Sequence, residues 1–380
     1  MSPDRGGGRY AAPMPEQSGL PIPPRASFEP TLPADPNLIN LHDYERVAAE
    51  RLAPGPLAYF TGGAGDEVTL RDNRAAFARQ AIVPRVMRDV SGIDMSIEVF
   101  GRRWPTPIFI APTALQRMAH PDGELATARS AASRGMTLTV STSASTDMAD
   151  IAEVGGPRWF QVYLLADPGA RRAMIERAVE HGYEALVLTV DLARIGRRER
   201  DLRIGFRIPE GVEIPNVAVA AGVTPEEVAS VAFVDRMTWA DLEWLAGFGL
   251  PVVIKGILHP DDARLAIEHG AAAVQVSNHG GRQLDGAIAS LDALPAVAEA
   301  VDGRIPILLD GGVRRGTDVL IAMALGSRAV GIGRPVIWGL AVDGQAGVGN
   351  VLDLLTNELE NAMALAGAPT IADLTPELLA

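Results

Sequence analysis

A short polar segment in the second half of the chain carries the residues best suited to acid–base chemistry. It reads Ser277-Asn278-His279-Gly280-Gly281-Arg282 and follows an apolar run. The imidazole of a histidine titrates near neutral pH, so His279 could take up a proton and return it. Asp191, which ends another apolar run, could pair with His279 and fix one tautomer, or serve only as a loop or capping residue. The pattern favours a general base at His279.

Two arginines could bind a carboxylate beside that base. A guanidinium matches a carboxylate with two parallel hydrogen bonds, which a lysine cannot do. Arg282 lies three residues after His279, whereas Arg198 lies in a basic run that is otherwise typical of a solvated face. Tyr59 and Tyr163 could each donate a phenolic hydrogen bond, or contribute only packing. These residue types together indicate a site for a small organic acid.

Two glycine- and arginine-containing segments near the C-terminus could bind a phosphate. Residues 310–316 read Asp-Gly-Gly-Val-Arg-Arg-Gly, and Gly333-Arg334 follows a later apolar run. Glycines let backbone N–H groups approach an anion, and the helix that follows would present its positive N-terminus. Arg314 or Arg315, with Arg334, would add charge-assisted hydrogen bonds. The alternative is a glycine turn with solvated arginines.

The elements that must position these residues alternate along the chain. Short apolar runs, typical of strands buried on both faces, are separated by amphipathic helical stretches such as 123–134, 168–181, 260–269, 291–301 and 316–325. The predicted strands are residues 107–111, 138–141, 158–163, 185–190, 251–255, 272–277, 306–309 and 329–332. Eight strands joined by helical crossovers predict an α/β fold, the TIM (β/α)8 barrel, whose active sites lie at the C-terminal ends of the strands.

The segments outside this alternation set the domain organisation. Residues 1–38 are rich in Pro, Gly and Ser and predict a disordered tail, and residues 39–380 predict a single barrel domain. A helical pattern begins at Leu41, and residues 39–106 form an extension that plugs the bottom of the barrel or covers its rim. The long connection after the fourth strand, residues 196–238, is of the length expected for a lid, a binding loop or a disordered segment.

Composition excludes several classes of function. No run of about 18 residues is apolar and uncharged, which argues against a membrane span. The chain has no cysteine, so it has no disulfide and no zinc–sulfur site, and we expect a cytoplasmic protein without a metal. The net charge of −13 argues against nucleic-acid binding. Because an acidic surface repels a carboxylate, an acid-binding site must carry its own arginines.

The segment from Ser277 to Asp285 resembles the FMN-dependent 2-hydroxy acid oxidases and dehydrogenases. The resemblance covers roughly residues 40–370 and extends to residues 59–73 (YFTGGAGDEVTLRDN), 110–114 (IAPTA), 118–123 (MAHPDG), 188–191 (LTVD), 310–316 (DGGVRRG) and 333–335. Residues 155–163 and 255–260 look especially like lactate oxidase. The resemblance implies an FMN cofactor, a homotetramer and oxidation of an (S)-2-hydroxy acid to a 2-oxo acid.

The resemblance also implies a role for each candidate residue. Tyr59, Arg198 and Arg282 would bind the substrate carboxylate and Tyr163 its hydroxyl, with His279 as the base supported by Asp191. The expected flavin contacts are Pro112, Thr113, Ala114, Ser141, Gln161, Thr189, Lys255, Ser277 and Asp310 for the ring and ribityl chain, and Gly312, Arg314, Gly333 and Arg334 for the phosphate. Lys255 would stabilise negative charge on the reduced flavin.

Three departures from the family pattern bear on the substrate. Ser143 stands where many members have an aromatic residue, Leu192-Ala193 replaces a common Thr-Pro pair, and Phe60 replaces a second tyrosine. We expect the loss of the aromatic side chain to enlarge the pocket and to favour lactate or a bulkier acid over glycolate. Ala114 is typical of the oxidases, so O2 is the expected acceptor. The alternatives are a dehydrogenase of the family that uses a quinone or another acceptor, and an FMN-dependent isomerase or maturation enzyme.

Overall fold

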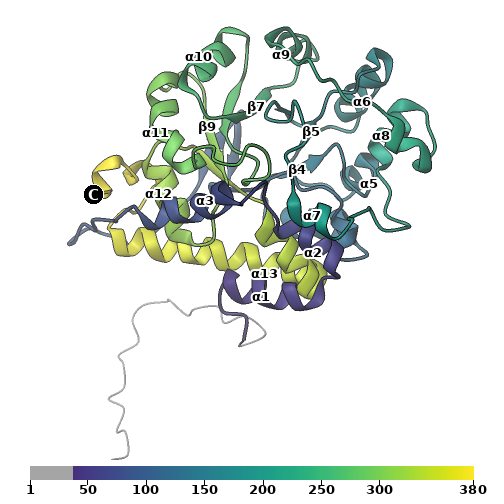
Figure 1. The fold of residues 1–380 in the computed structure, drawn as a ribbon. Helices are drawn as coiled ribbons and strands as arrows, with labels where there is room; N and C mark the ends of the chain where they lie inside the picture. Colours follow the sequence, from purple (N-terminus) through teal and green to yellow (C-terminus); the bar gives the residue numbers. More distant parts are fainter. Residues whose placement is uncertain (1–36) are drawn as a thin grey trace, which may run out of the picture. The chain divides into compact units, whose positions relative to one another are not determined.

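The computed structural model describes residues 37–380, and its centre is a closed barrel of eight parallel strands (Figure 1). Around the barrel the order is β10-β3-β4-β5-β6-β7-β8-β9. The strands are β3 (Ile108–Ile110), β4 (Leu138–Ser141), β5 (Arg158–Val162), β6 (Leu186–Thr189), β7 (Val252–Ile257), β8 (Ala273–Val276), β9 (Ile307–Asp310) and β10 (Ala329–Ile332). All eight predicted strands are confirmed. They could be recognised in the sequence because they are buried on both faces and therefore consist mostly of apolar residues.

Helices surround the barrel, as the alternating sequence pattern predicts. In Figure 1, α10, α11 and α12 lie on one side, and α5, α6 and α8 lie on the other. The helices after the strands are α4 (Gly123–Ala132), α5 (Met148–Glu153), α6 (Pro168–Glu180), α9 (Trp239–Ala246), α10 (Pro260–Glu268), α11 (Ser290–Val301), α12 (Gly316–Ala324) and α13 (Arg334–Ala366), and a one-turn η1 (Gln116–Met118) precedes α4. The last, α13, is kinked at Asp343 and Gly344, and η3 (Ile371–Asp373) and η4 (Pro376–Leu378) follow it.

The extension before the barrel contributes to both ends of the barrel. Its helices α1 (Leu41–Arg51), α2 (Pro54–Thr61) and α3 (Val68–Ala78) precede a hairpin of β1 (Ile97–Val99) and β2 (Arg102–Trp104). The buried Trp104 packs on Phe109 and Trp159, with ring centroids 6.0 and 5.3 Å away, and so closes the N-terminal end of the barrel. Tyr59 and Phe60 of α2 lie instead at the opposite rim, where they line a cavity. Both expectations for this extension are therefore met.

The long connection after β6 contains structure of its own. It forms α7 (Glu199–Arg203), α8 (Pro215–Ala221) and η2 (Pro225–Ser230) before α9 begins. The fully buried Asn216 fixes it to the barrel, because its side chain accepts from Met148 N and donates to Ser141 O at 2.8 and 3.4 Å. An antiparallel bridge joins Leu165 and Phe233. Such hydrogen bonding to the rest of the chain cannot be read from the connection's length.

The described residues all belong to one compact unit. The predicted disordered tail, residues 1–38, lies outside the described residues except for its last two. Among the residues that the structure describes, no helix is both long and apolar enough to cross a membrane.

Candidate active site

The C-terminal ends of the barrel strands enclose a cavity of about 1230 Å3, its open mouth included. Every strand sends residues to this rim, which the barrel geometry requires of a functional site. Seventeen of the predicted site residues line the cavity: Tyr59, Pro112, Thr113, Ala114, Ser141, Gln161, Tyr163, Thr189, Arg198, Lys255, His279, Arg282, Asp310, Gly312, Arg314, Gly333 and Arg334. The remaining two, Asp191 and Ser277, lie directly behind the lining and support it, as described below.

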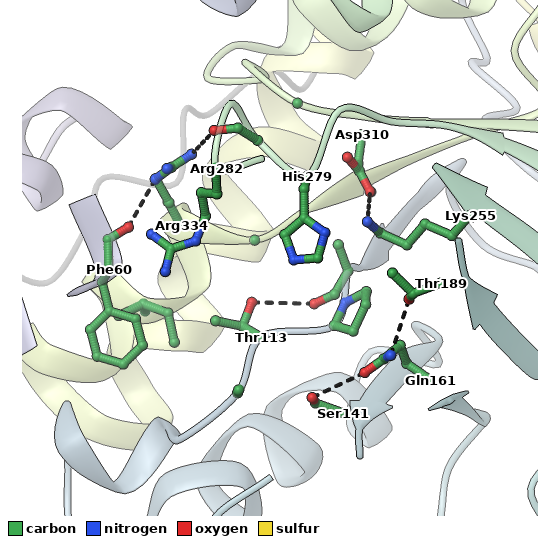
Figure 2. Close-up of a pocket in the computed structure, with 18 of the residues that line it drawn as sticks. Phe60, Thr113, Ser141, Gln161, Thr189, Lys255, His279, Arg282, Asp310 and Arg334 are labelled. Carbon is green, nitrogen blue, oxygen red and sulfur yellow. Dashed lines mark hydrogen bonds and ion pairs between the residues drawn. The ribbon is translucent and has the colours of Figure 1, made fainter. Parts of the chain in front are cut away.

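The imidazole of His279 projects into the cavity between the arginines on one side and Lys255 on the other (Figure 2). His279 has a left-handed backbone, φ 58°, and its N–H donates to Ser277 Oγ at 3.1 Å. Its Nδ1 lies 2.9 Å from Asp191 Oδ1. Non-glycine residues rarely adopt this conformation, and such strain persists mainly where the surroundings impose it.

Burial and the carboxylate act on this pair in opposite directions. Burial lowers the pKa of His279, and Asp191 partly offsets that effect. Burial raises the pKa of Asp191, but His279 and Lys255 outweigh it, so the net direction is downward. An ionised Asp191 therefore faces a neutral imidazole at neutral pH, with the proton on Nδ1 and the lone pair of Nε2 free. This is the protonation state that a general base requires.

Lys255 heads a second buried network. Its ammonium donates to Ser277 Oγ at 3.0 Å and lies 3.5 Å from Asp310, while Ser277 Oγ donates to Asp310 at 2.6 Å. Sequence reasoning missed Gln275, which donates to the same carboxylate at 2.6 Å from the middle of β8. Strand β7 runs two residues past its predicted end, and its register shifts between Lys255 and Ile257. The shift falls at Gly256, against which Asp191 packs.

A chain of side-chain hydrogen bonds crosses three neighbouring strands at the base of the cavity. Ser141 Oγ donates to Gln161 Oε1 at 3.1 Å, and Gln161 Nε2 donates to Thr189 Oγ1 at 3.0 Å (Figure 2). All three side chains are buried. These hydrogen bonds fix the three polar side chains in place at the cavity wall, where a bound ligand could contact them.

Four arginines line this cavity without a carboxylate partner anywhere in the described part of the chain. Arg334 donates to the carbonyls of Phe60, Gly62 and Gly280, and Arg282 to those of Tyr59 and Gly62. Arg314 lies over the ring of Trp338, 4.5 Å from its centroid, and its buried Nε has no hydrogen-bond partner among the described residues. The fourth is Arg198, which makes only long contacts to Arg282 O and Gln283 Oε1.

Burial is the main influence on the guanidinium groups, and their mutual repulsion adds to it. Burial lowers the pKa of Arg282 and of Arg314 to about 10. Burial also lowers the pKa of Arg334, which Arg282 and Arg314 depress further. Burying a cation without a paired anion costs free energy. The binding of an anionic ligand would therefore stabilise this cluster of arginines. The arginines that the acidic composition required are present.

The candidate phosphate site differs from its prediction in one respect. The N-terminus of α12 is not available to a ligand, because the carboxylate of Asp318 accepts from Arg314 N and Arg315 N at 2.7 and 2.9 Å. Arg315 pairs with Glu358 instead of reaching the cavity. The helix that faces the cavity is α13, which begins at Arg334. Within the described residues, Gly312 and Gly333 donate their N–H groups to no other residue.

Part of the cavity wall is apolar. Phe60, Leu192, Ile195 and the small Ser143 line it, so the three departures from the family pattern all fall on the cavity. Ile195 is 76% exposed, and Phe206 stacks on Tyr59 with ring centroids 5.1 Å apart. Ile195 was not predicted to line the cavity, because no local pattern distinguishes an apolar loop residue that lines a cavity from one that does not. Phe206, which packs behind Tyr59, was not predicted for the same reason.

Comparison with known proteins gives the family. The sequence pattern of the FMN-dependent dehydrogenases matches residues 48–380. The chain belongs to this family. It is 48% identical to L-lactate oxidase of Nostoc sp. over 356 residues, which cover 90% of this chain and 98% of the relative. It is 43% identical to glycolate oxidase 3 of Arabidopsis thaliana over 348 residues, 89% and 95% of the two chains. A crystal structure of mandelate oxidase superposes with a TM-score of 0.83 at 43% identity, covering 90% and 98% of the chains.

The cofactor is FMN, and the residues present fit it. A phosphate would satisfy the unpartnered Nε of Arg314 and the N–H groups of Gly312 and Gly333, next to Arg334. The polar row of Ser141, Gln161 and Thr189 offers donors and acceptors suited to the edge of a flavin ring. When bound, FMN supplies two-electron redox chemistry, which no side chain can perform. The predicted cofactor and barrel are thus confirmed.

Proposed function

We propose that this protein oxidises (S)-2-hydroxy acids to 2-oxo acids and transfers the electrons to O2, giving hydrogen peroxide. One observation carries the proposal: the neutral imidazole of His279, oriented by Asp191, shares a cavity with Arg198 and Arg282, which have no carboxylate partner among the described residues. A base beside two unsatisfied cations is suited to an anionic substrate that must lose a proton. The relatives named lactate, glycolate and mandelate oxidase agree with this reading.

The side chains divide the reaction into binding and proton transfer. Arg282, Arg198 and Tyr59 bind the carboxylate, and Tyr163 donates to or accepts from the hydroxyl group. His279 Nε2 takes a proton from the substrate, and Asp191 stabilises the imidazolium that forms. The substrate loses two electrons and two protons in all, and reduction of O2 by the same numbers yields H2O2. Lys255 keeps a positive charge in the electron-accepting half of the cavity.

Burial keeps Tyr163 in its neutral form. It raises the pKa of this phenol, so Tyr163 serves as a hydrogen-bonding group rather than as a base. His279 is therefore the base in the proposed reaction.

Anaerobic mixing tests the proposal directly. Purified yellow protein is mixed with a panel of (S)-2-hydroxy acids, and bleaching of the flavin absorbance is followed. We expect bleaching with at least one acid; His279→Gln should abolish it while FMN stays bound. Arg282→Lys should mainly raise KM and also slow reduction, because the forked contact is lost. No bleaching with any acid, despite bound FMN, would refute the proposed reaction and favour an isomerase or a binding role.

The size of the pocket leads us to propose lactate or a bulkier acid over glycolate as substrate. Ser143 lines the cavity where an aromatic side chain would occupy space. We expect kcat/KM to be higher for lactate, 2-hydroxyoctanoate or mandelate than for glycolate, and Ser143→Tyr to reverse the order. A clear preference for glycolate in the wild type would contradict this. Oxygen consumption and peroxide release, compared with reduction of a quinone, test the acceptor.

We also propose a cytoplasmic location and a homotetramer. The absence of cysteine suits a reducing compartment, and the tetramer follows from the family resemblance. Cell fractionation tests the first, and light scattering after size exclusion tests the second.

A further inference from the structure

Gln283 joins the loop after β8 to the loop after β6 through every hydrogen-bonding group of its side chain. Its Nε2 donates to Asp191 O at 2.8 Å and to Arg194 O at 2.9 Å. Its Oε1 accepts from Gly196 N at 3.2 Å and from Arg198 Nη2 at 3.4 Å. All four contacts fall within residues 191–198. This segment carries Asp191, whose carboxylate contacts the base, and Arg198, which together with Arg282 forms the proposed substrate-binding pair, called here the carboxylate clamp.

The backbones of the two loops also touch. A Cβ atom added at Gly196 would lie 2.3 Å from Arg282 O and 2.7 Å from Gln283 Cα, so only glycine permits this approach. The guanidinium of Arg198 reaches the same Arg282 carbonyl at 3.5 Å. Gly196 thus brings the two arginine-bearing loops into contact, and the Gln283 amide fixes their relative position.

We propose that Gln283 is a positioning residue for the carboxylate clamp and for the base. The inference rests on the proposed function and deepens it. Gln283 has no donor or acceptor left for a substrate, so it acts through Arg198 and Asp191. Its side chain is half-buried and its neighbour Leu284 is 75% exposed, so its contribution lies in these hydrogen bonds rather than in core packing.

No other side chain can make the same four contacts. Two backbone carbonyls require donors, and a backbone N–H and a guanidinium require an acceptor, which a primary amide provides at this length. A glutamate would turn a carboxylate oxygen toward the carbonyls of Asp191 and Arg194 and would pair with Arg198 in competition with the substrate. A leucine would leave both carbonyls and Gly196 N without partners.

The test measures binding of oxalate to the FMN-loaded, oxidised protein by perturbation of the flavin spectrum. Oxalate presents a carboxylate but has no α-hydrogen, so binding is separated from turnover. The variants are Gln283→Leu and Gln283→Glu. The matched control is Arg203→Gln, which removes an ion pair with Glu199 in the same loop; the Arg203 side chain is 72% exposed and makes none of the Gln283 contacts.

We expect the Kd of oxalate to rise about 30-fold in both Gln283 variants and to change less than about 2-fold in the control, with FMN content and Tm unchanged. The KM for the acid should rise with the Kd, and the rate of flavin reduction should fall because Asp191 shifts. An oxalate Kd within about 3-fold of wild type, or loss of FMN in both variants, would overturn the assignment. Oxalate binding that depends on Gln283, without reduction of the wild type by any acid, would leave Gln283 assigned and refute the proposed oxidation.

Discussion

Among single residues, the Asp191–His279 pair carries the proton transfer of the proposed reaction, and its energetics give a prediction. Asp191→Asn removes the charge that stabilises the imidazolium and an acceptor that selects the tautomer. We expect the rate of flavin reduction to fall by about 10²- to 10⁴-fold with little change in KM, measured by anaerobic stopped flow. A loss of less than about tenfold would mean that the pair is not part of proton transfer.

The same pair predicts the pH dependence. Burial lowers the pKa of His279 below 6.5, and only the neutral imidazole accepts a proton. The value of kcat/KM should therefore rise with pH, with the midpoint of the rise below 6.5. Because Asp191 raises the pKa of His279, Asp191→Asn should move this acid limb to still lower pH. An acid limb above the ordinary histidine value would contradict the assignment.

Among the elements, the contact between α3 and the loop after β9 shapes the proposed phosphate site. Gly312 has φ +86°, and an added Cβ would lie 2.0 Å from the carbonyl oxygen of Asn73. We expect Gly312→Ala to displace the loop and raise the Kd of FMN roughly 100-fold, measured by the fluorescence of released FMN. Gly155→Ala is the matched control, since its φ is +82° but nothing lies within 4 Å. Equal effects of the two changes would attribute the result to backbone strain alone.

The elements were largely predictable, and the exceptions have physical reasons. The barrel strands were recognisable because buried parallel strands are apolar throughout and the polar residues that follow them share one rim. The hairpin of β1 and β2 was missed, since strands of three residues carry too short a pattern. The availability of the α12 N-terminus was misjudged because Asp318, four residues from Arg314, caps it.

For the molecule as a whole, the unpaired cavity arginines predict a large stabilisation by FMN. Arg314 is buried, Arg334 is half-buried, and neither has a carboxylate partner among the described residues, so their repulsion opposes folding in the absence of an anionic ligand. At FMN about 1,000-fold above its Kd, we expect about 4 kcal/mol of added stability, which for a chain of this length is a rise in Tm of roughly 6 °C over the FMN-free protein. Calorimetry measures it, and coincident melting curves would be contrary to this account.

The contacts that sequence reasoning missed join segments far apart in the chain. Asn73 and Asn278 exchange two amide hydrogen bonds of 2.8 Å, which anchors α3 to the loop that bears His279. Gln275 and Gln283 support charged residues whose own roles were predicted. Each is an ordinary polar residue in its local sequence, so only the folded chain reveals its partner. Residue type and strand position were sufficient for the groups that face the cavity.

The aromatic floor of the barrel has a kinetic consequence. Trp104, Phe109 and Trp159 pack against one another away from the cavity, so we expect reactant and product to pass through the same cavity mouth. A departing 2-oxo acid carries the same carboxylate as the arriving molecule and occupies the same arginines. Accumulated product should therefore inhibit competitively with respect to substrate, and turnover at high conversion should be limited by the rate of product dissociation.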